Sequence, residues 1–475
     1  MKMYIQKNRV KKKKDMKINY SEINEPIKDC SQKIIQISDQ TIKERLNKVL
    51  TKINERHLDG IIIYGDVEHG NNFEYLVGFL PRFEEALLVL FKDGSASLVF
   101  GNENFNKVSK SRIKANGLLA SYFSLSNQPM QNNEPLIEIL RKTGISNKRM
   151  GIVGWKNFTS RYEDNKQMYD MPAYIFEPIK KLCGENNISN ETDIFIGKDG
   201  VRLKNNANEI AHYEFFASLA SDSMLDGLNS LKEGVSEMEV ADKLNRYGQR
   251  NSIVTICAFG PRFINGNMYP TENRLKKSDT ISMTISYRGG LSSRSLFAAK
   301  DENDLPQEQK DYLEIVVKPY YQAMATWLEN VHIGMKGKEV YQMIEDVLPQ
   351  NKYHWLLNPG HTTADEEWLN SPIYADSDEQ IVSGMIFQTD IIPSVEGYHG
   401  TNMESTCVFA DEKLKNEIKK EYPDLWNRMM QRREYIINKT GIMLNDDILP
   451  MCSSLTYLRP FAFSKKAMCK ETSDH

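Results

Sequence analysis

The stretch from residue 280 to residue 300 constrains this chain most, because it contains no Asp, Glu or His between Asp279 and Asp301. Its first eight residues alternate between hydroxyl and apolar side chains, in the order Thr280, Ile281, Ser282, Met283, Thr284, Ile285, Ser286, Tyr287. Successive side chains of a β-strand point to opposite faces. The pattern therefore predicts a strand with one apolar face and one face of hydroxyl groups.

The composition of the whole chain narrows the possible functions. Its 475 residues suffice for two domains with a sizeable core, and its 40% hydrophobic and 26% charged residues are typical of an ordinary soluble protein. A net charge of -3 argues against a nucleic-acid partner. The chain has no apolar run of about eighteen residues, so we expect no membrane span and no membrane partner.

The N-terminus begins with a basic run, Lys7, Arg9 and residues 11–14, which no apolar segment follows. We therefore expect that this basic run is not a secretory signal. We predict a solvated tail over residues 1–35, and Met16 is a candidate for the true start. The cysteines lack short paired spacings, which argues against a zinc knuckle or a disulfide framework and favours reduced thiols and a cytoplasmic location. They are Cys30, Cys183, Cys257, Cys407, Cys452 and Cys469.

Residues 36–190 have the pattern of an α/β domain. A helix is predicted by apolar residues three to four positions apart, namely Ile42, Leu46, Val49, Leu50 and Ile53. Residues 61–64 and 86–91 predict buried strands. Between them lies the aromatic-rich segment 71–79, NNFEYLVGF, which we take as a further strand. A turn-rich stretch over 186–191 separates this domain from the rest of the chain.

The second half of the chain begins with signals for long helices. Gly234 is typical of a left-handed helix end, and Ser236 with Glu239 forms a capping box for the next helix. A second unit of this kind runs over residues 307–348, with Gly334 in the corresponding position. The repetition predicts two helical units of the same plan, and an unrelated α+β domain is the alternative because helix caps are common.

Three later segments carry polar residues in a recognisable order. They are NPGH over 358–361, GMIFQTD over 384–390 and NMEST over 402–406. Together with the N-terminal pattern, they resemble the pita-bread hydrolases, the family of creatinase, aminopeptidase P and prolidase. The resemblance implies an α+β fold: a pita-bread catalytic domain over residues 191–475, with 411–475 as a C-terminal extension, preceded by a creatinase-like α/β N-terminal domain over 36–190.

The resemblance also implies site residues. In the family, the three segments supply one histidine and two glutamates that bind metal, and these positions are His361, Asp390 and Glu404 here. We expect His361 and Glu404 to lie within reach of each other at the floor of the largest polar pocket.

Other family ligands are missing from this sequence. The first of two metal-binding aspartates corresponds to Thr284, and the second corresponds to Leu291 or Arg294, depending on the alignment. A histidine expected after the first segment is Trp368. Two bridged divalent cations require a shared carboxylate and further oxygen ligands. We therefore expect no dinuclear metal centre.

The stretch over residues 280–300, which lacks the family's aspartates, contains two arginines. Arg288 and Arg294 can each clamp a carboxylate with two hydrogen bonds, so we take them, with Thr284 and Trp368, as candidate residues for binding a small substrate that carries a carboxylate. Arg82 is a further candidate. In creatinase an arginine at the matching place reaches the neighbouring subunit's site, so the resemblance implies a homodimer.

Three functions remain open. The first is a metal-independent hydrolase or lyase of a carbon–nitrogen bond in a small anionic, amino-acid-like substrate, with His361 as general acid-base oriented by Asp390 or Glu404. The second keeps one divalent metal on these three residues, as in a mononuclear peptidase-like hydrolase. The third is a non-catalytic pita-bread binding protein. We favour the first and expect no cofactor, or at most one divalent metal.

Overall fold

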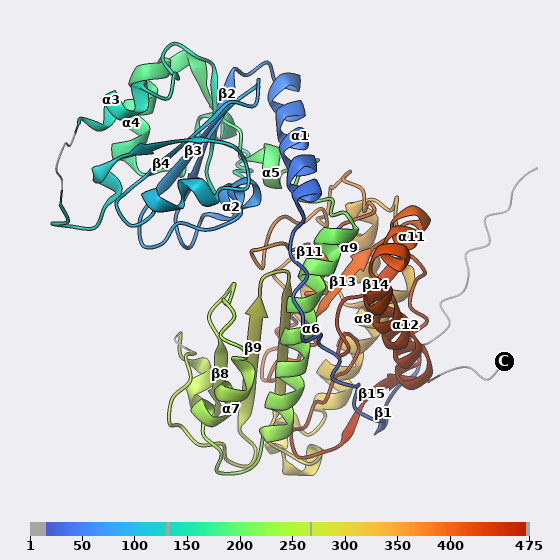
Figure 1. Ribbon diagram of the computed structural model, residues 1–475. Helices are drawn as coiled ribbons and strands as arrows, with labels where there is room; N and C mark the ends of the chain where they lie inside the picture. Colours follow the sequence, from blue (N-terminus) through green and yellow to red (C-terminus); the bar gives the residue numbers. More distant parts are fainter. Residues whose placement is uncertain (1–15, 130–133, 267, 472–475) are drawn as a thin grey trace, which may run out of the picture.

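The protein has two domains along the described chain. The computed structural model describes residues 16–129, 134–266 and 268–471, and the basic run at 7–14 lies outside them. Figure 1 shows the smaller N-terminal domain above the larger C-terminal domain, with the long helix α6 (Ala207–Ser230) starting at the junction. The short helix α5 (Asp193–Ile196) lies just before it in sequence.

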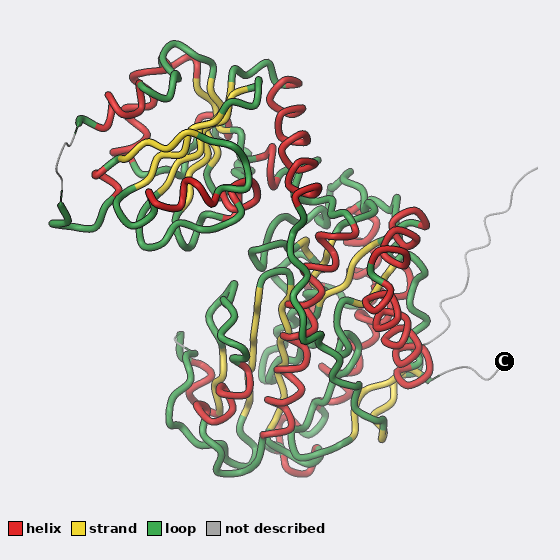
Figure 2. The backbone as a smooth tube through the Cα atoms, in the orientation of Figure 1, coloured by secondary structure: helices red, strands yellow, loops and turns green. Residues whose placement is uncertain are grey.

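The N-terminal domain is a six-stranded sheet between two layers of helices (Figure 2). Along the strand at 60–65, Ile61 and Ile63 pack towards one helical layer, and Ile62 and Tyr64 pack towards the other. The strand order is β5-β4-β3-β2-β6-β7. The strands are β2 (Gly60–Gly65), β3 (Ala86–Phe91), β4 (Ala96–Phe100), β5 (Asn116–Leu119), β6 (Met150–Val153) and β7 (Ile188–Asn190). The helices are α1 (Asp39–Glu55), α2 (Asn71–Val77), α3 (Leu136–Arg141) and α4 (Ala173–Cys183).

The helix predicted over 42–53 and the strands predicted at 61–64 and 86–91 are confirmed by α1, β2 and β3. The strand predicted over 71–79 is wrong, because residues 71–77 form helix α2. Every residue of α2 is buried, so its sequence lacks the alternation that distinguishes a helix from a strand. Gly78 ends the helix in the left-handed conformation, with φ of 87°.

The C-terminal domain contains two antiparallel sheets, each covered by a long helix. The first has the order β10-β9-β8 and the second β11-β12-β13-β14. Their strands are β8 (Ile256–Phe259), β9 (Thr280–Tyr287), β10 (Gly290–Phe297), β11 (His361–Thr362), β12 (Ile386–Gln388), β13 (Thr406–Phe409) and β14 (Ile448–Pro450). Before the C-terminal extension, its helices besides α6 are α7 (Glu237–Leu244), α8 (Lys318–Asn330), α9 (Gly337–Val347) and α10 (Gln350–Tyr353).

The predicted helical signals are present in this domain. The capping box of Ser236 and Glu239 starts α7, and Gly234 has φ of 84°. The second unit has the same plan, since Gly334 has φ of 91° between α8 and α9. Each unit thus places one long helix on a sheet and turns into a shorter helix.

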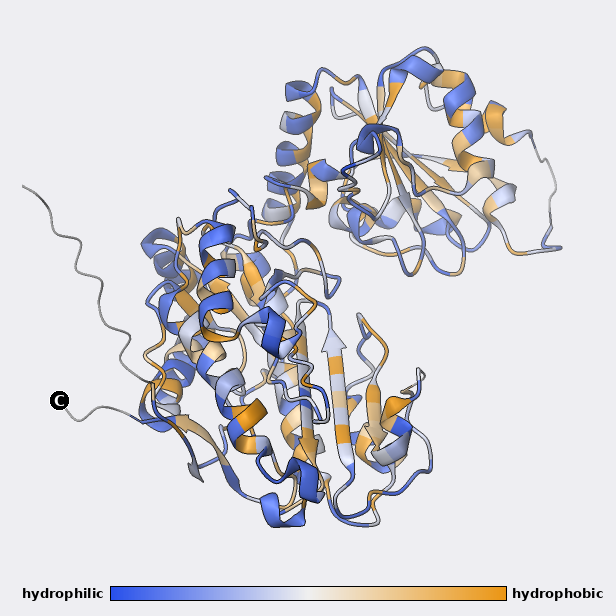
Figure 3. Ribbon diagram, turned by 180° about the vertical axis from the view of Figure 1, so that it is seen from behind, coloured by the Kyte–Doolittle hydropathy of each residue, from blue (hydrophilic) through white to orange (hydrophobic). Residues whose placement is uncertain are grey.

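Strand β9 has the two faces that its sequence predicts, visible as alternating bands in Figure 3. Its apolar residues share a core with residues of α6. Its hydroxyl face is also buried: Thr284 Oγ1 lies 2.7 Å from Ser293 Oγ of β10. Asn402, in the segment before β13, donates a hydrogen bond to Ser293 Oγ at 2.9 Å. The hydroxyl face therefore joins the two sheets.

The C-terminal extension packs against the domain. It begins with two helices, α11 (Glu412–Glu421) and α12 (Pro423–Tyr435), which are separate because Pro423 cannot continue the hydrogen bonding of α11. Strand β14 then joins the second sheet beside β13. The segment 457–461 is buried and bridges β10 at Phe461.

Residues 18–22, which the sequence assigned to a solvated tail, instead form strand β1 (Ile18–Glu22). This strand pairs antiparallel with β15 (Lys466–Lys470) of the extension. Further on, Cys30 donates its backbone N–H to Asp222 of α6 at 2.9 Å. The tail prediction is therefore wrong for this part, because apolar residues such as Ile18 are buried there.

No helix among the described residues is both long enough and apolar enough to cross a lipid bilayer. All six cysteine thiols are free, as their irregular spacing predicts.

Candidate active site

Three neighbouring strands bring His361, Asp390 and Glu404 together. His361 starts β11 opposite Gln388 of β12, and Gln388 lies opposite Thr406 of β13. Asp390 comes two residues after Gln388 and Glu404 two residues before Thr406, so the pairing places both acids beside the histidine. Nε2 of His361 lies 3.8 Å from Oδ2 of Asp390 and 3.9 Å from Oε1 of Glu404. All three side chains are buried.

A fourth residue, Glu367, completes this group and was not predicted. Its Oε1 lies 2.9 Å from Nε2 of His361, closer than either predicted acid. The sequence contained a signal for it, because three acids in a row follow the histidine at 365–367. Family resemblance drew attention to the next residue, Trp368, instead.

Trp368 covers one face of the imidazole. Its ring stacks on that of His361, with centroids 4.1 Å apart and planes 21° apart, while 40% of Trp368 remains exposed. The histidine is thus held between an indole ring and carboxylates.

The electrostatics of this group are unusual, because three carboxyl groups share one buried imidazole. Burial by itself would lower the pKa of His361, but the neighbouring acids Glu367, Glu404 and Asp390 outweigh it and raise the pKa to about 10. Burial raises the pKa of Asp390 well above its usual range, and the charge of Glu404 adds to this. Burial raises the pKa of Glu404 as well. The group therefore has an excess of negative charge, which a proton or a cation must offset.

The comparisons with known proteins point to one family. Residues 215–409 match metallopeptidase family M24. The fold is similar to that of prolidase from Pyrococcus horikoshii, with a TM-score of 0.60 at 16% identity over 77% of this chain and 95% of that one. The dipeptidase PepE from Mycobacterium ulcerans gives a TM-score of 0.60 at 16% identity, covering 79% and 95%. An uncharacterized peptidase of Staphylococcus epidermidis is 20% identical over 290 residues, 56% of this chain and 80% of that protein.

The C-terminal domain has the pita-bread fold, and residues 215–409 within it match the M24 family. The resemblance drawn from the sequence is confirmed, together with the α/β N-terminal domain, which the similar structures also cover.

The pita-bread site contains a group of side chains that could hold a divalent cation. Donor atoms of His361, Glu367 and Glu404 lie within 4.8 Å of one another. Glu404 Oε1 has no hydrogen-bond partner among the residues that the structure describes. Thr284, which corresponds to the first family aspartate, is hydrogen-bonded to Ser293 and supplies no carboxylate. Nitrogen and carboxylate oxygen donors of this kind suit one zinc, manganese or iron ion.

The predicted arginines lie elsewhere than expected. Arg294 is buried, and its guanidinium donates to the carbonyl oxygens of Ser293, Glu404, Ser454 and Tyr457 and to Ser405 Oγ. Its predicted role as a substrate clamp is therefore wrong, because these five bonds occupy it. Arg288 pairs with Glu74 of the N-terminal domain at 2.9 Å. Arg82 is exposed on the N-terminal domain, and its backbone N–H donates to Asn104.

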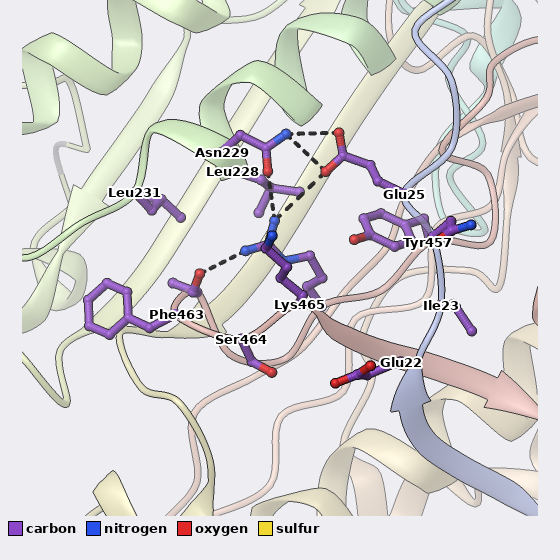
Figure 4. Close-up of a pocket in the computed structure, with 13 residues that line it drawn as sticks. Glu22, Ile23, Glu25, Leu228, Asn229, Leu231, Tyr457, Phe463, Ser464 and Lys465 are labelled. Atoms are coloured by element: carbon purple, nitrogen blue, oxygen red, sulfur yellow. Dashed lines mark hydrogen bonds and ion pairs between the residues drawn. The ribbon is translucent and has the colours of Figure 1, made fainter.

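A polar cavity of about 840 Å³ lies away from the His361 group (Figure 4). It is lined by the segment 22–25, the end of α6 and residues 457–465. Arg459 donates there to Asn229 at 3.0 Å and to the carbonyl of Ala462 at 2.7 Å, so it ties these segments together. His361 and Glu404 do not line this cavity, and their place at the floor of the largest polar pocket stays a prediction.

Proposed function

We propose that this protein is a hydrolase that cleaves a carbon–nitrogen bond in a small, amino-acid-like substrate and that its site holds one divalent cation. The observation that carries the proposal is the convergence of His361, Glu367 and Glu404 in one buried place, with donor atoms within 4.8 Å. The match to family M24 supports the hydrolase class. The excess of carboxyl groups over positive charge supports the cation.

In this proposal His361, Glu367 and Glu404 hold the cation. A cation held there would polarise the scissile carbonyl and lower the pKa of a bound water. The hairpin that follows β11 supplies Glu367, which offsets in part the loss of the two family aspartates. Trp368, stacked on the imidazole, fixes the ring plane of His361 and shields it from water.

Asp390 acts as the proton donor. It is one methylene shorter than the glutamate of the family, and its Oδ2 remains 3.8 Å from the imidazole. Burial holds the pKa of Asp390 well above its ordinary value, which favours the protonated form of the carboxyl group. Its Oδ1 has no hydrogen-bond partner within the described chain. The proton can pass to the nitrogen as the carbon–nitrogen bond breaks.

A second candidate is the metal-independent hydrolase or lyase that the sequence favoured. The 2.9 Å ion pair between His361 and Glu367 supports it, because a carboxylate in that position raises the basicity of an imidazole. In this alternative His361 is the general acid-base, and the site needs no cation.

Elemental analysis separates the two candidates. After dialysis against a weak chelator, we expect about one equivalent of manganese, zinc or iron per chain, and less than about a tenth of that in Glu404→Gln and in Glu367→Gln. The matched control is Glu396→Gln, an exposed glutamate in the segment between Asp390 and Glu404, which should keep the metal. Circular dichroism checks that each variant is folded.

The other outcomes are equally informative. Two equivalents would contradict the one-cation site. Less than a tenth of an equivalent in a protein that still hydrolyses dipeptides or N-acyl amino acids would favour the metal-independent candidate. A metal-free protein with no turnover on either substrate class, and with wild-type behaviour in His361→Ala, would leave only the binding protein.

A further inference from the structure

Glu367 and Trp368 lie on a tight hairpin over residues 362–370, which we call the acidic hairpin. Its two ends are paired, since Thr362 donates its N–H to the carbonyl of Asn370 at 2.7 Å and Leu369 donates to Thr362 at 2.9 Å. Within it, Thr363 Oγ1 donates to the carbonyl of Glu366 at 2.8 Å. The position of Glu367 beside His361 therefore depends on how the whole hairpin is held.

Two arginines, the buried Arg202 and the partly buried Arg288, hold the acidic hairpin by its other two acids. Arg202 donates through Nη1 to Glu366 Oε1 at 2.7 Å and pairs through Nη2 with the second carboxylate oxygen of Glu366. Arg288 Nη1 lies 3.7 Å from Asp365 Oδ1. Tyr213 of α6 donates its hydroxyl to Asp365 Oδ2 at 3.0 Å. A two-pronged arginine contact fixes orientation as well as distance.

The same two arginines reach helix α2 of the N-terminal domain. Arg202 Nη1 donates to Asn72 Oδ1 at 2.8 Å. Arg288 Nη2 donates to both carboxylate oxygens of Glu74, at 2.9 and 3.1 Å. Each arginine therefore spans from α2 to the acidic hairpin. The side chains of Arg202, Glu74 and Asp365 are almost fully buried, so these charges are poorly screened by water.

We propose that α2 positions Glu367 through Arg202 and Arg288, so that the docking of the N-terminal domain sets the cation affinity of the site. The inference rests on the proposed one-cation site. Asn72, Glu74 and the two arginines are positioning residues, since none of them contacts His361. Breaking the link at α2 frees the arginines to turn towards solvent, and the acidic hairpin then loses its fixed place.

The test changes α2 alone and measures two quantities. Glu74→Gln removes the charge that anchors Arg288 and keeps the size of the side chain. We expect the dissociation constant for MnCl2, measured by calorimetry on metal-depleted protein, to rise at least tenfold. We also expect the emission of Trp368 to shift to longer wavelength without metal, because the indole leaves the imidazole. The Trp368 signal is the difference between each protein and its Trp368→Phe counterpart.

The matched control is Glu209→Gln. Glu209 pairs with Arg45 of α1 at 2.7 Å, so this variant weakens another contact between the domains without touching the acidic hairpin. It should keep wild-type Mn²⁺ affinity and Trp368 emission. Asn72→Ala, which loosens Arg202 instead, replaces Glu74→Gln if that variant does not fold.

The outcomes distinguish the two proposals. Wild-type affinity and unchanged Trp368 emission in Glu74→Gln would overturn the positioning role, as would an equal loss of affinity in Glu209→Gln. If the wild-type protein binds no Mn²⁺, the one-cation proposal fails, and the Trp368 emission still decides whether α2 holds the acidic hairpin.

Discussion

Among single residues, Asp222 shows how a buried carboxyl group adjusts to its surroundings. It lies on α6 with 5% of its surface exposed. Its carboxylate accepts backbone N–H groups from Asp29 at 3.3 Å and Cys30 at 2.9 Å. Burial raises its pKa to about 6, against the two hydrogen bonds and Arg432, while the charge of Asp29 adds to the increase.

This pKa predicts a pH dependence of stability. Because the folded pKa of about 6 exceeds the ordinary 3.8, folding takes up a proton, and the stabilisation present below pH 3.8 is lost as pH rises through about 6. The variant Asp222→Asn does not lose stability in this way, because asparagine does not ionise. Its free energy of unfolding relative to wild type should therefore increase by about 3 kcal/mol between acidic and neutral pH. Urea unfolding at several pH values measures this, and a constant difference would contradict it. Asp242→Asn, at an exposed site of α7, is the control.

Some individual residues of the His361 site could be predicted from the sequence. His361, Asp390 and Glu404 followed from the order of three motifs, which local sequence carries. Glu367 and the partners of Arg294 did not follow, because a side chain's direction depends on packing that the pattern does not encode. The sequence around Arg294 would look the same whether this arginine bound a substrate or five groups of its own chain.

Between elements, Arg294 joins β10 to the C-terminal extension. Its guanidinium donates to Ser454 and Tyr457 of the extension as well as to Glu404. Burial lowers its pKa to about 10. Lysine has three donors in place of five and lacks their planar arrangement. Some of these buried carbonyl groups would therefore lose their partner on substitution.

We predict that Arg294→Lys lowers the free energy of unfolding by about 3 kcal/mol. Chemical denaturation measures this, with Arg274→Lys as a control, because Arg274 is an exposed arginine of the same domain. A residue that clamped substrate would instead change KM at unchanged stability, and that result would restore the role that the sequence suggested.

Element boundaries were predictable where local chemistry sets them. The capping box at Ser236 and the alternation in β9 depend on neighbouring residues only, and both were correct. Helix α2 was missed because it is buried on all sides, which gives helix and strand the same apolar pattern. The strand β1 was missed because its partner lies more than four hundred residues away.

At the scale of the whole molecule, the homodimer stays a prediction. Arg82 is followed by Phe83, which is 61% exposed and has a left-handed φ of 63°. A bulky residue rarely adopts this conformation on an exposed loop without a function. We expect sedimentation velocity at micromolar concentration to give a dimer, and Arg82→Ala combined with Phe83→Gly to weaken it. A wild-type monomer would remove the prediction.

The pairing of β1 with β15 also sets the order of events during synthesis. Translation adds about 5 to 20 residues per second, so on the order of a minute passes between the synthesis of β1 and the synthesis of β15. The N-terminal sheet, whose strands lie between residues 60 and 190, can form long before that. The C-terminal domain cannot complete its fold until translation has passed β15. During this interval the apolar side of β1 and the surface that receives it stay uncovered, and this is when a nascent chain of this protein most needs a chaperone.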